Sequence, residues 1–168
     1  MPDRVKVAIV GSGPAGLSAA ARAAQLGMAH VLLEKTDHLS DTIYKYQKGK
    51  HVMATPSNLV LRSDLDFEAG KRETILGIWD EQIDGHKVNV MLNAEVNAIT
   101  GKKGEFRIAL KNGQTVEAEA IVLAIGTQGN PNLVRCPVED GAQVQYQLDD
   151  PGEYVDEHIV VIGAGDAG

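Results

Sequence analysis

Val7-Ala8-Ile9-Val10-Gly11-Ser12-Gly13-Pro14-Ala15-Gly16 is the stretch that decides the fold. Four apolar residues lead directly into a G-x-G-x-x-G run, the fingerprint of a strand that turns into a helix and holds a dinucleotide. Gly11 permits the tight turn, Gly13 lets a pyrophosphate approach the backbone, and Gly16 lets the helix pack closely on the strand. We therefore expect the loop from Gly11 to Gly16 to bind a pyrophosphate.

The residues on either side of this fingerprint predict a complete βαβ unit. The β-branched stretch Val5–Val10 is typical of a buried parallel strand. Residues 14–26 are rich in Ala and Leu, begin with a proline and stop at Gly27, which predicts a helix. His30–Glu34 predicts the second strand. A carboxylate at its end, Glu34, is placed to accept hydrogen bonds from both hydroxyls of an adenosine ribose and to repel a 2′-phosphate.

The rest of residues 1–126 predicts an α/β fold with an inserted antiparallel sheet. Apolar residues at helical spacing, short alternating strands and turn signals such as Asn112-Gly113 support this interpretation. The predicted elements are, in order, a helix at 66–83, a strand at 88–92, meander strands at 95–100, 105–110 and 115–118, and an apolar strand at 120–125 that ends at Gly126. The predicted fold class is therefore a Rossmann-like parallel sheet with a β-meander inserted at about 93–118.

A second copy of the fingerprint stands at residues 159–168. Ile159-Val160-Val161-Ile162 leads into Gly163-Ala164-Gly165-Asp166-Ala167-Gly168, so that Gly163, Gly165 and Gly168 match the three fingerprint glycines. We expect residues 158–168 to be the first strand and loop of a second, truncated dinucleotide-binding domain. Residues 127–157 then form an irregular acidic connection between the two domains.

Composition excludes some classes of function. The chain has 168 residues, of which 43% are apolar, and a net charge of −7, which argues against nucleic acid as a partner. No apolar run reaches the length of a membrane span. Residues 136–168 contain eight acidic side chains and no Lys or Arg, which indicates a boundary near residues 126–137.

Cysteine and histidine usage points to neither a disulfide nor a metal. The single cysteine, Cys136, cannot form an internal disulfide, so we expect a reducing cytoplasm as the compartment and an unreactive thiol. The five histidines lack the spacing of metal ligands. We therefore predict no metal site and no catalytic side chain in this chain.

The order of these parts resembles the FAD domain of the two-dinucleotide-fold flavoproteins. Within them it is most similar to the pyridine nucleotide–disulfide oxidoreductases of the thioredoxin reductase-like branch. The resemblance is carried by the first fingerprint, Leu33-Glu34-Lys35, Ile121-Val122-Leu123-Ala124-Ile125-Gly126 and the second fingerprint. The family usually has Ala-Thr-Gly where this chain has Ala124-Ile125-Gly126.

The resemblance implies FAD as the cofactor and assigns residues to it. The implied contacts are the pyrophosphate on Gly11, Ser12, Gly13, Pro14, Ala15 and Gly16, the adenosine ribose on Glu34 with Lys35 beside it, the adenine edge on the backbone of Val96, and the turn beside the FAD at Ala124, Ile125 and Gly126. For Val96 the alternative is an ordinary core residue, and for Lys35 it is a solvated surface side chain.

In the family, NAD(P)H bound to the second domain reduces the flavin, which passes electrons to an acceptor. This chain has no C-x-x-C pair and breaks off within the second fingerprint, so we expect no NAD(P)H-driven activity from it alone and no acceptor can be named. An alternative to a second domain is that Ile159–Ile162 adds to the first sheet and brings Asp166 near the flavin. Assembly as a homodimer is left open. The alternatives to an FAD domain are a nucleotide-binding module without catalysis and the NAD-binding domain of a dehydrogenase.

Overall fold

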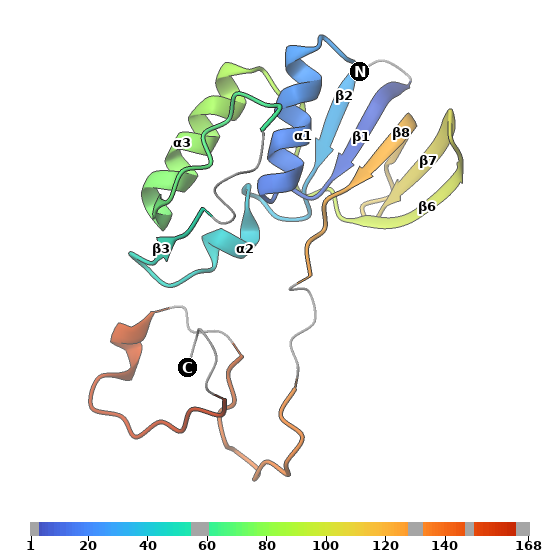
Figure 1. The fold of residues 1–168 in the computed structure, drawn as a ribbon. Coiled ribbons are helices and arrows are strands. Elements are labelled where there is room, and N and C mark those ends of the chain that lie inside the picture. The colour runs from blue at the N-terminus through green and yellow to red at the C-terminus, as the bar shows by residue number, and fades with distance from the viewer. Residues whose placement is uncertain (1–3, 55–60, 128–132, 147–149, 164–168) are drawn as a thin grey trace.

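A computed structural model describes residues 4–54, 61–127, 133–146 and 150–163 (Figure 1). Its centre is a six-stranded sheet in the order β5-β2-β1-β8-β7-β6. The sheet contains β1 (Val5–Val10), β2 (His30–Leu33), β5 (Val90–Met91), β6 (Val96–Lys102), β7 (Glu105–Leu110) and β8 (Thr115–Leu123). The other elements are α1 (Pro14–Gln25), α2 (Asp41–Tyr44), α3 (Arg72–Gly85), β3 (His51–Val52), β4 (Gly70–Lys71) and a 3-10 turn at Pro151–Tyr154. The predicted α/β fold with a parallel sheet and an antiparallel insertion is confirmed.

Two apolar cores lie on opposite faces of the parallel strands. Successive side chains of a strand point to opposite faces, so Val7 and Ile9 pack with α1 and α3, whereas Ala8 and Val10 pack with the meander. The helix-side core takes Trp79 and its neighbours from α3, and the other core takes Ile108 from β7. Figure 1 shows α1 and α3 together on one side of the sheet. The βαβ unit is thus buried on both faces, which explains its near-continuous apolar sequence.

β8 is one continuous strand where the sequence predicted two. Its first half pairs antiparallel with β7, from Thr115 opposite Ala109 to Ala118 opposite Phe106. Its second half pairs parallel with β1, and Leu123 lies opposite Val10. The strand stays intact between the predicted pieces because each half has its own partner. No described strand pairs with the other edge of residues 119–123, and 62% of Leu123 is exposed.

The helix predicted from residue 66 begins at Arg72 instead. Gly70 and Lys71 are extended because they pair with β3. Before them, the indole N–H of Trp79 donates to the carbonyl of Asp66 at 2.6 Å, and the Asp66 N–H donates to Gln82 at 2.9 Å. Side chains of α3 therefore satisfy this backbone in an extended form, which helical spacing alone does not predict.

The strand predicted at residues 159–162 is absent from the described part of the chain. Residues 158–163 form no regular element, and the side chains of Ile159, Val160, Val161 and Ile162 are 60–88% exposed. A parallel strand depends on neighbours for its hydrogen bonds and its cover, and no described strand pairs with this segment. The expectation that it joins the first sheet is therefore wrong. Gly165, Asp166 and Gly168 lie outside the described residues, so the second fingerprint stays a prediction.

Residues 127–157 contain little regular structure where they are described. The 3-10 turn at Pro151–Tyr154 is the single helical element within residues 133–146 and 150–163. Across the described ranges, no helix is both long enough and apolar enough to cross a membrane.

Candidate nucleotide-binding site

The first fingerprint forms a tight loop between β1 and α1, at the carboxyl end of the parallel strands. Gly11 has a φ of +97° and donates its N–H to Leu33 at 2.8 Å, which fixes the loop to the end of β2. A Cβ on Gly11 would lie 2.5 Å from the carbonyl oxygen of Ala124, and a Cβ on Gly16 would lie 1.8 Å from that of Gly11. Both positions therefore require glycine because of the chain's own packing.

Gly13 differs from the other two glycines. Its φ is −67°, which any residue adopts, and no atom of the chain lies within 4 Å of the position that a Cβ would take. Gly13 is the N-cap of α1 and supplies no side-chain cap, and the first turn contains no acidic residue. Unpaired N–H groups and the positive end of the helix dipole therefore face the open space beside Gly13, an arrangement suited to a phosphate.

Glu34 follows β2, and its carboxylate is turned towards the phosphate loop. Only 5% of the residue is exposed. Its Oε2 accepts hydrogen bonds from the N–H of Ser12 at 3.0 Å and from the Ser12 hydroxyl at 2.5 Å. Its Oε1 accepts from the N–H of Thr36 at 3.1 Å. The carboxylate thus joins the phosphate loop to the chain that follows β2, which places it beside the predicted pyrophosphate site.

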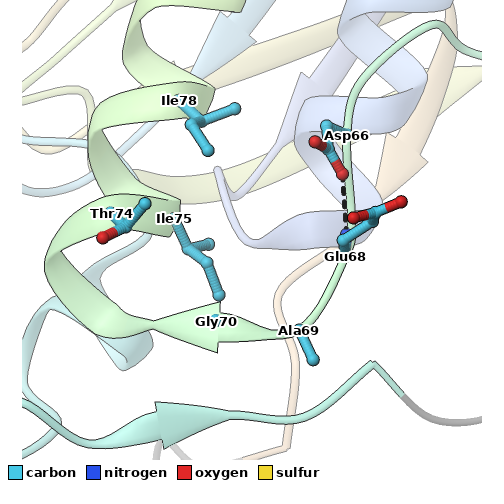
Figure 2. A pocket seen from close by; sticks show the side chains of 7 residues that line it. All are labelled: Asp66, Glu68, Ala69, Gly70, Thr74, Ile75 and Ile78. Carbon is cyan, nitrogen blue, oxygen red and sulfur yellow. Dashed lines mark hydrogen bonds between the residues drawn. The ribbon is translucent and has the colours of Figure 1, made fainter.

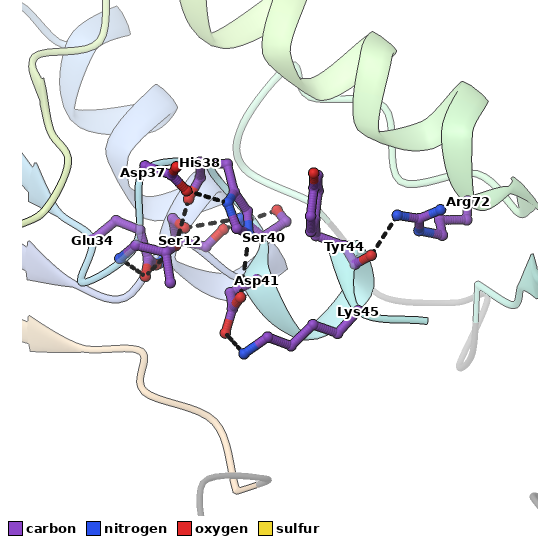
Figure 3. A network of polar contacts seen from close by, with 10 residues as sticks. Ser12, Glu34, Asp37, His38, Ser40, Asp41, Tyr44, Lys45 and Arg72 are labelled. Atoms are coloured by element: carbon purple, nitrogen blue, oxygen red, sulfur yellow. Dashed lines mark hydrogen bonds and ion pairs between the residues drawn. The ribbon is translucent and has the colours of Figure 1, made fainter. Parts of the chain in front are cut away.

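Ser12 and Ser40 continue this buried polar network (Figure 3). The N–H of Ser40 donates to the Ser12 hydroxyl at 2.9 Å, and the Ser40 hydroxyl donates to the carbonyl of Ser12 at 3.0 Å. The two serines are 0% and 2% exposed. Ser40 has a φ of +57°, a strained value for serine, which the two bonds to Ser12 compensate.

The two other predicted segments border the same loop. The N–H of Ala124 donates to the carbonyl of Val10 at 2.8 Å, so Ala124 lies directly beside the turn. The N–H of Ala94 donates to the Glu34 carbonyl at 2.7 Å, which places the segment leading to Val96 at the end of β2. Val96 is half-buried and packs against the core on the meander side. The structure therefore gathers around one loop the segments that the sequence analysis selected.

Some predicted residues are peripheral to this arrangement. Lys35 is exposed, and so are Ile125 and Gly126. Ile125 leaves 70% of its surface uncovered. Gly126 has a φ of +64°, so the chain turns away from the sheet there. Their predicted contacts with a cofactor stay predictions.

A second polar group is formed by residues on both sides of Ser40 in the chain. The His38 ring lies between two carboxylates, 2.7 Å from Asp37 Oδ1 through Nδ1 and 3.2 Å from Asp41 Oδ1 through Nε2, and it stacks on Tyr44 with ring centroids 3.8 Å apart. The hydrogen bond with His38 lowers the pKa of Asp37 below its ordinary value. Arg72 donates to the Tyr44 carbonyl at 2.5 Å and so ties α2 to the start of α3. This group braces the connection that carries Ser40.

The cleft in Figure 2 lies outside this site. It is a shallow space of about 100 Å³ between the first turns of α3 and the preceding segment. Its lining residues are Asp66, Glu68, Ala69, Gly70, Thr74, Ile75 and Ile78. Since none of them belongs to the phosphate loop or its network, the cleft plays no part in the nucleotide site.

No cluster of three or more His, Cys, Asp or Glu side chains in the described parts of the chain is arranged to hold a metal ion. Cys136 is exposed and forms no disulfide.

Sequence reasoning missed three contributors to the site: Thr36, Ser40 and Ala94. The polar stretch that contains the first two had no periodicity to assign it. A signal was nonetheless present, since small hydroxyl residues closely following an acidic strand end are suited to hydrogen-bond with it. Ala94 contributes through its backbone, which no residue pattern reveals.

The family model for pyridine nucleotide-disulphide oxidoreductases matches residues 8–168, nearly the whole chain. The chain belongs to this family. The matched range includes the residues of both fingerprints.

Curated relatives extend the comparison. The chain is 28% identical over 158 residues to a ferredoxin–NADP reductase of Ignicoccus hospitalis, covering 94% of this chain and 48% of that protein. It is 29% identical over 174 residues to a thioredoxin reductase of Peptoclostridium litorale, covering 99% of this chain and 49% of that protein. The chain thus spans about half the length of the curated relatives it matches.

Solved structures show the same fold. Bacillithiol disulfide reductase from Staphylococcus aureus superposes with a TM-score of 0.77 at 23% identity, covering 90% of this chain and 47% of that one. A ferredoxin-flavin thioredoxin reductase from Clostridium acetobutylicum superposes with a TM-score of 0.58 at 27% identity, covering 78% of this chain and 40% of that one. The chain is therefore similar to flavoprotein oxidoreductases of the thioredoxin reductase and ferredoxin–NADP reductase type.

Proposed function

We propose that residues 1–126 form an FAD-binding domain and that the chain is the FAD-binding portion of an NAD(P)H-dependent flavoprotein reductase. The loop from Gly11 to Gly16 and the N-terminus of α1 bind the pyrophosphate. Glu34 binds the adenosine ribose, and the backbone near Val96 meets the adenine. FAD, when bound, supplies the two-electron chemistry that this chain's own side chains lack.

The observation that carries the proposal is the open space at Gly13. Packing explains Gly11 and Gly16, since a Cβ at either would meet backbone atoms. Neither packing nor backbone conformation explains Gly13. A ligand that approaches the backbone does explain it, and the helix N-terminus behind Gly13 makes that ligand an anion.

Titration of the purified chain with FAD, followed by the change in flavin fluorescence, tests the proposal. We expect saturable binding that Gly13→Ala weakens by about tenfold or more, because a methyl group fills the space that the pyrophosphate needs. The same substitution should alter the free energy of unfolding by about 1 kcal/mol or less, because it meets no atom of the chain. Binding that Gly13→Ala leaves unchanged would contradict the proposal.

Parallel titrations with NADH and ADP separate the alternatives. Tight NADH binding without FAD binding favours the NAD-binding domain of a dehydrogenase. Binding of ADP without binding of FAD or NADH favours a nucleotide-binding module without catalysis. A titration with NADPH tests the role of the Glu34 carboxylate. We expect NADPH to bind more weakly than NADH, because the negative charge of Glu34 repels its 2′-phosphate.

The remaining predictions concern the whole protein. We propose that residues 127–157 connect the FAD domain to an NAD(P)H-binding domain that begins at 158–168, and that the cytoplasm is the compartment. The residues of this chain assign neither the electron acceptor nor the choice between NADH and NADPH as the reductant. We expect no NADPH oxidation by the 168-residue chain with added FAD.

A further inference from the structure

Ser12 has the only polar side chain in the loop from Gly11 to Gly16, and this side chain is turned away from the phosphate site. It lies inside the molecule, 0% exposed, between Glu34 and the backbone of Ser40. The Ser12 hydroxyl is therefore not placed to bind the phosphate, and the burial of this side chain needs another explanation.

The hydrogen-bond partners of the Ser12 hydroxyl fix the direction of its proton. A hydroxyl group has one proton to donate and two lone pairs to accept with. The Ser40 N–H occupies a lone pair at 2.9 Å, and the proton is directed at Glu34 Oε2, 2.5 Å away. No solvent reaches Ser12, so water cannot replace either bond.

The two carboxylate oxygens of Glu34 therefore differ in the number of acceptor positions that remain free. A carboxylate has about four acceptor positions, two on each oxygen. On Oε2 both are taken by Ser12, through its N–H and its hydroxyl. On Oε1 the Thr36 N–H takes one. The Thr36 hydroxyl lies 3.2 Å from Oε1 but 2.8 Å from the carbonyl of His38, and its single proton goes to the nearer atom. One position on Oε1 is left.

We propose that Ser12 is a specificity-determining residue that locks Oε2 of Glu34 and leaves Oε1 to bind a single hydroxyl of the adenosine ribose. The inference rests on the proposed nucleotide site. It narrows the expectation that Glu34 binds both hydroxyls equally. Ser12 acts through Glu34 and is a positioning residue, while Ser40 holds the Ser12 hydroxyl in place.

Calorimetric titration with ADP, 2′-deoxy-ADP and 3′-deoxy-ADP tests this asymmetry. For the natural chain, removal of one hydroxyl should weaken binding by about tenfold, the value of a hydrogen bond to a charged group, and removal of the other by about twofold or less. In Ser12→Ala, Oε2 regains one acceptor position, so each ribose hydroxyl finds an acceptor and the two deoxy analogues should bind equally well. Ser40→Ala is the matched control, because it keeps the Ser40 N–H that holds the Ser12 hydroxyl, and it should retain the asymmetry.

The outcomes separate this inference from the proposed function. If the natural chain binds ADP but loses equal affinity for both analogues, the inference is overturned while the nucleotide site stands. It is also overturned if Ser12→Ala weakens all three ligands by one common factor, since that is the signature of a structural role. If neither ADP nor FAD binds the natural chain, the proposed function fails and the inference falls with it. Should Ser12→Ala fail to fold, Ser12→Cys, which keeps the volume and a weak donor, should show a reduced asymmetry.

Discussion

Residues 5–16 and 158–163 carry the same kind of sequence and have opposite surroundings. Ile9 is 0% exposed in the first region, whereas Val160 is 88% exposed in the second. Gly11 and Gly163 both have a positive φ, at +97° and +114°. A Cβ on Gly11 would lie 2.5 Å from a backbone oxygen, whereas one on Gly163 would have no atom within 4 Å.

The difference shows what the pattern alone specifies. An apolar run followed by glycines permits an extended segment and a turn directly after it. It becomes a strand in the first region because β2 and β8 pair with both edges of β1 and α1 covers it. In the second region no described strand or helix supplies those partners. The strand is therefore a property of the βαβ unit rather than of the six residues.

The largest expected effect comes from a matched pair of glycine substitutions. Gly16→Val places its Cβ against the backbone of Gly11 and should lower the free energy of unfolding by about 4 kcal/mol, or roughly 12 °C in Tm. Gly163→Val should leave Tm unchanged within about 1 °C, because nothing lies near its Cβ and no described strand or helix holds residues 158–163 to the φ of +114° that would strain a valine. Thermal unfolding followed by circular dichroism compares them. Equal losses would show that the second region is packed as the first is.

A smaller effect is expected from shortening the apolar residues themselves. Ile9→Ala removes a fully buried side chain between α1 and the sheet and should cost about 3 kcal/mol. Val161→Ala, at a side chain 62% exposed, should stay within about 0.5 kcal/mol. Urea unfolding of the two variants gives both values. A loss above 1 kcal/mol for Val161→Ala would mean that residues 159–162 are buried in solution.

The same contrast marks how far the sequence alone could predict the fold. β1, α1 and β2 were placed nearly to the residue because their pattern, their proline and their glycines all agree. The continuity of β8 could not be read from its residues, because it depends on two partners at different positions in the chain. The start of α3 was missed because long-range bonds from Trp79 and Gln82 hold residue 66 outside the helix.

For the site, the sequence identified the residue types but not their directions. Glu34 was expected to face a ribose, and the structure shows its carboxylate bound to Ser12 and Thr36. Ser12 was assigned to the pyrophosphate because it lies within the fingerprint. Its hydroxyl points the other way because Ser40, 28 residues later, donates to it. Side-chain direction here is set by a long-range contact, which motif spacing does not encode.

The smallest expected effect on stability comes from neutralising one carboxylate in the packed domain and one outside it. Asp80 lies on α3 and is exposed, yet the hydration that its carboxylate loses on folding, reinforced by the charge of Asp84, raises its pKa above the ordinary value of 3.8, so the folded chain binds this proton more tightly than the unfolded chain does. The stability that the neutral form provides is complete below the unfolded pKa and is lost as pH rises through the raised pKa. Asp80→Asn should therefore stabilise the chain at pH 7 by a few tenths of a kcal/mol. The gain should vanish below about pH 4, where Asp80 is already protonated.

Asp156→Asn, two residues before the second region, is the matched control. Asp156 is exposed and lies in a segment that no described strand pairs with, so neutralising it should not change Tm at either pH. Unfolding curves at pH 3.5 and pH 7 for the natural chain and both variants make the comparison. A gain for Asp156→Asn equal to that for Asp80→Asn would show that the effect arises from the net charge of −7 rather than from burial. A gain confined to Asp80→Asn would tie the effect to the packed domain, where a carboxylate loses part of its hydration on folding.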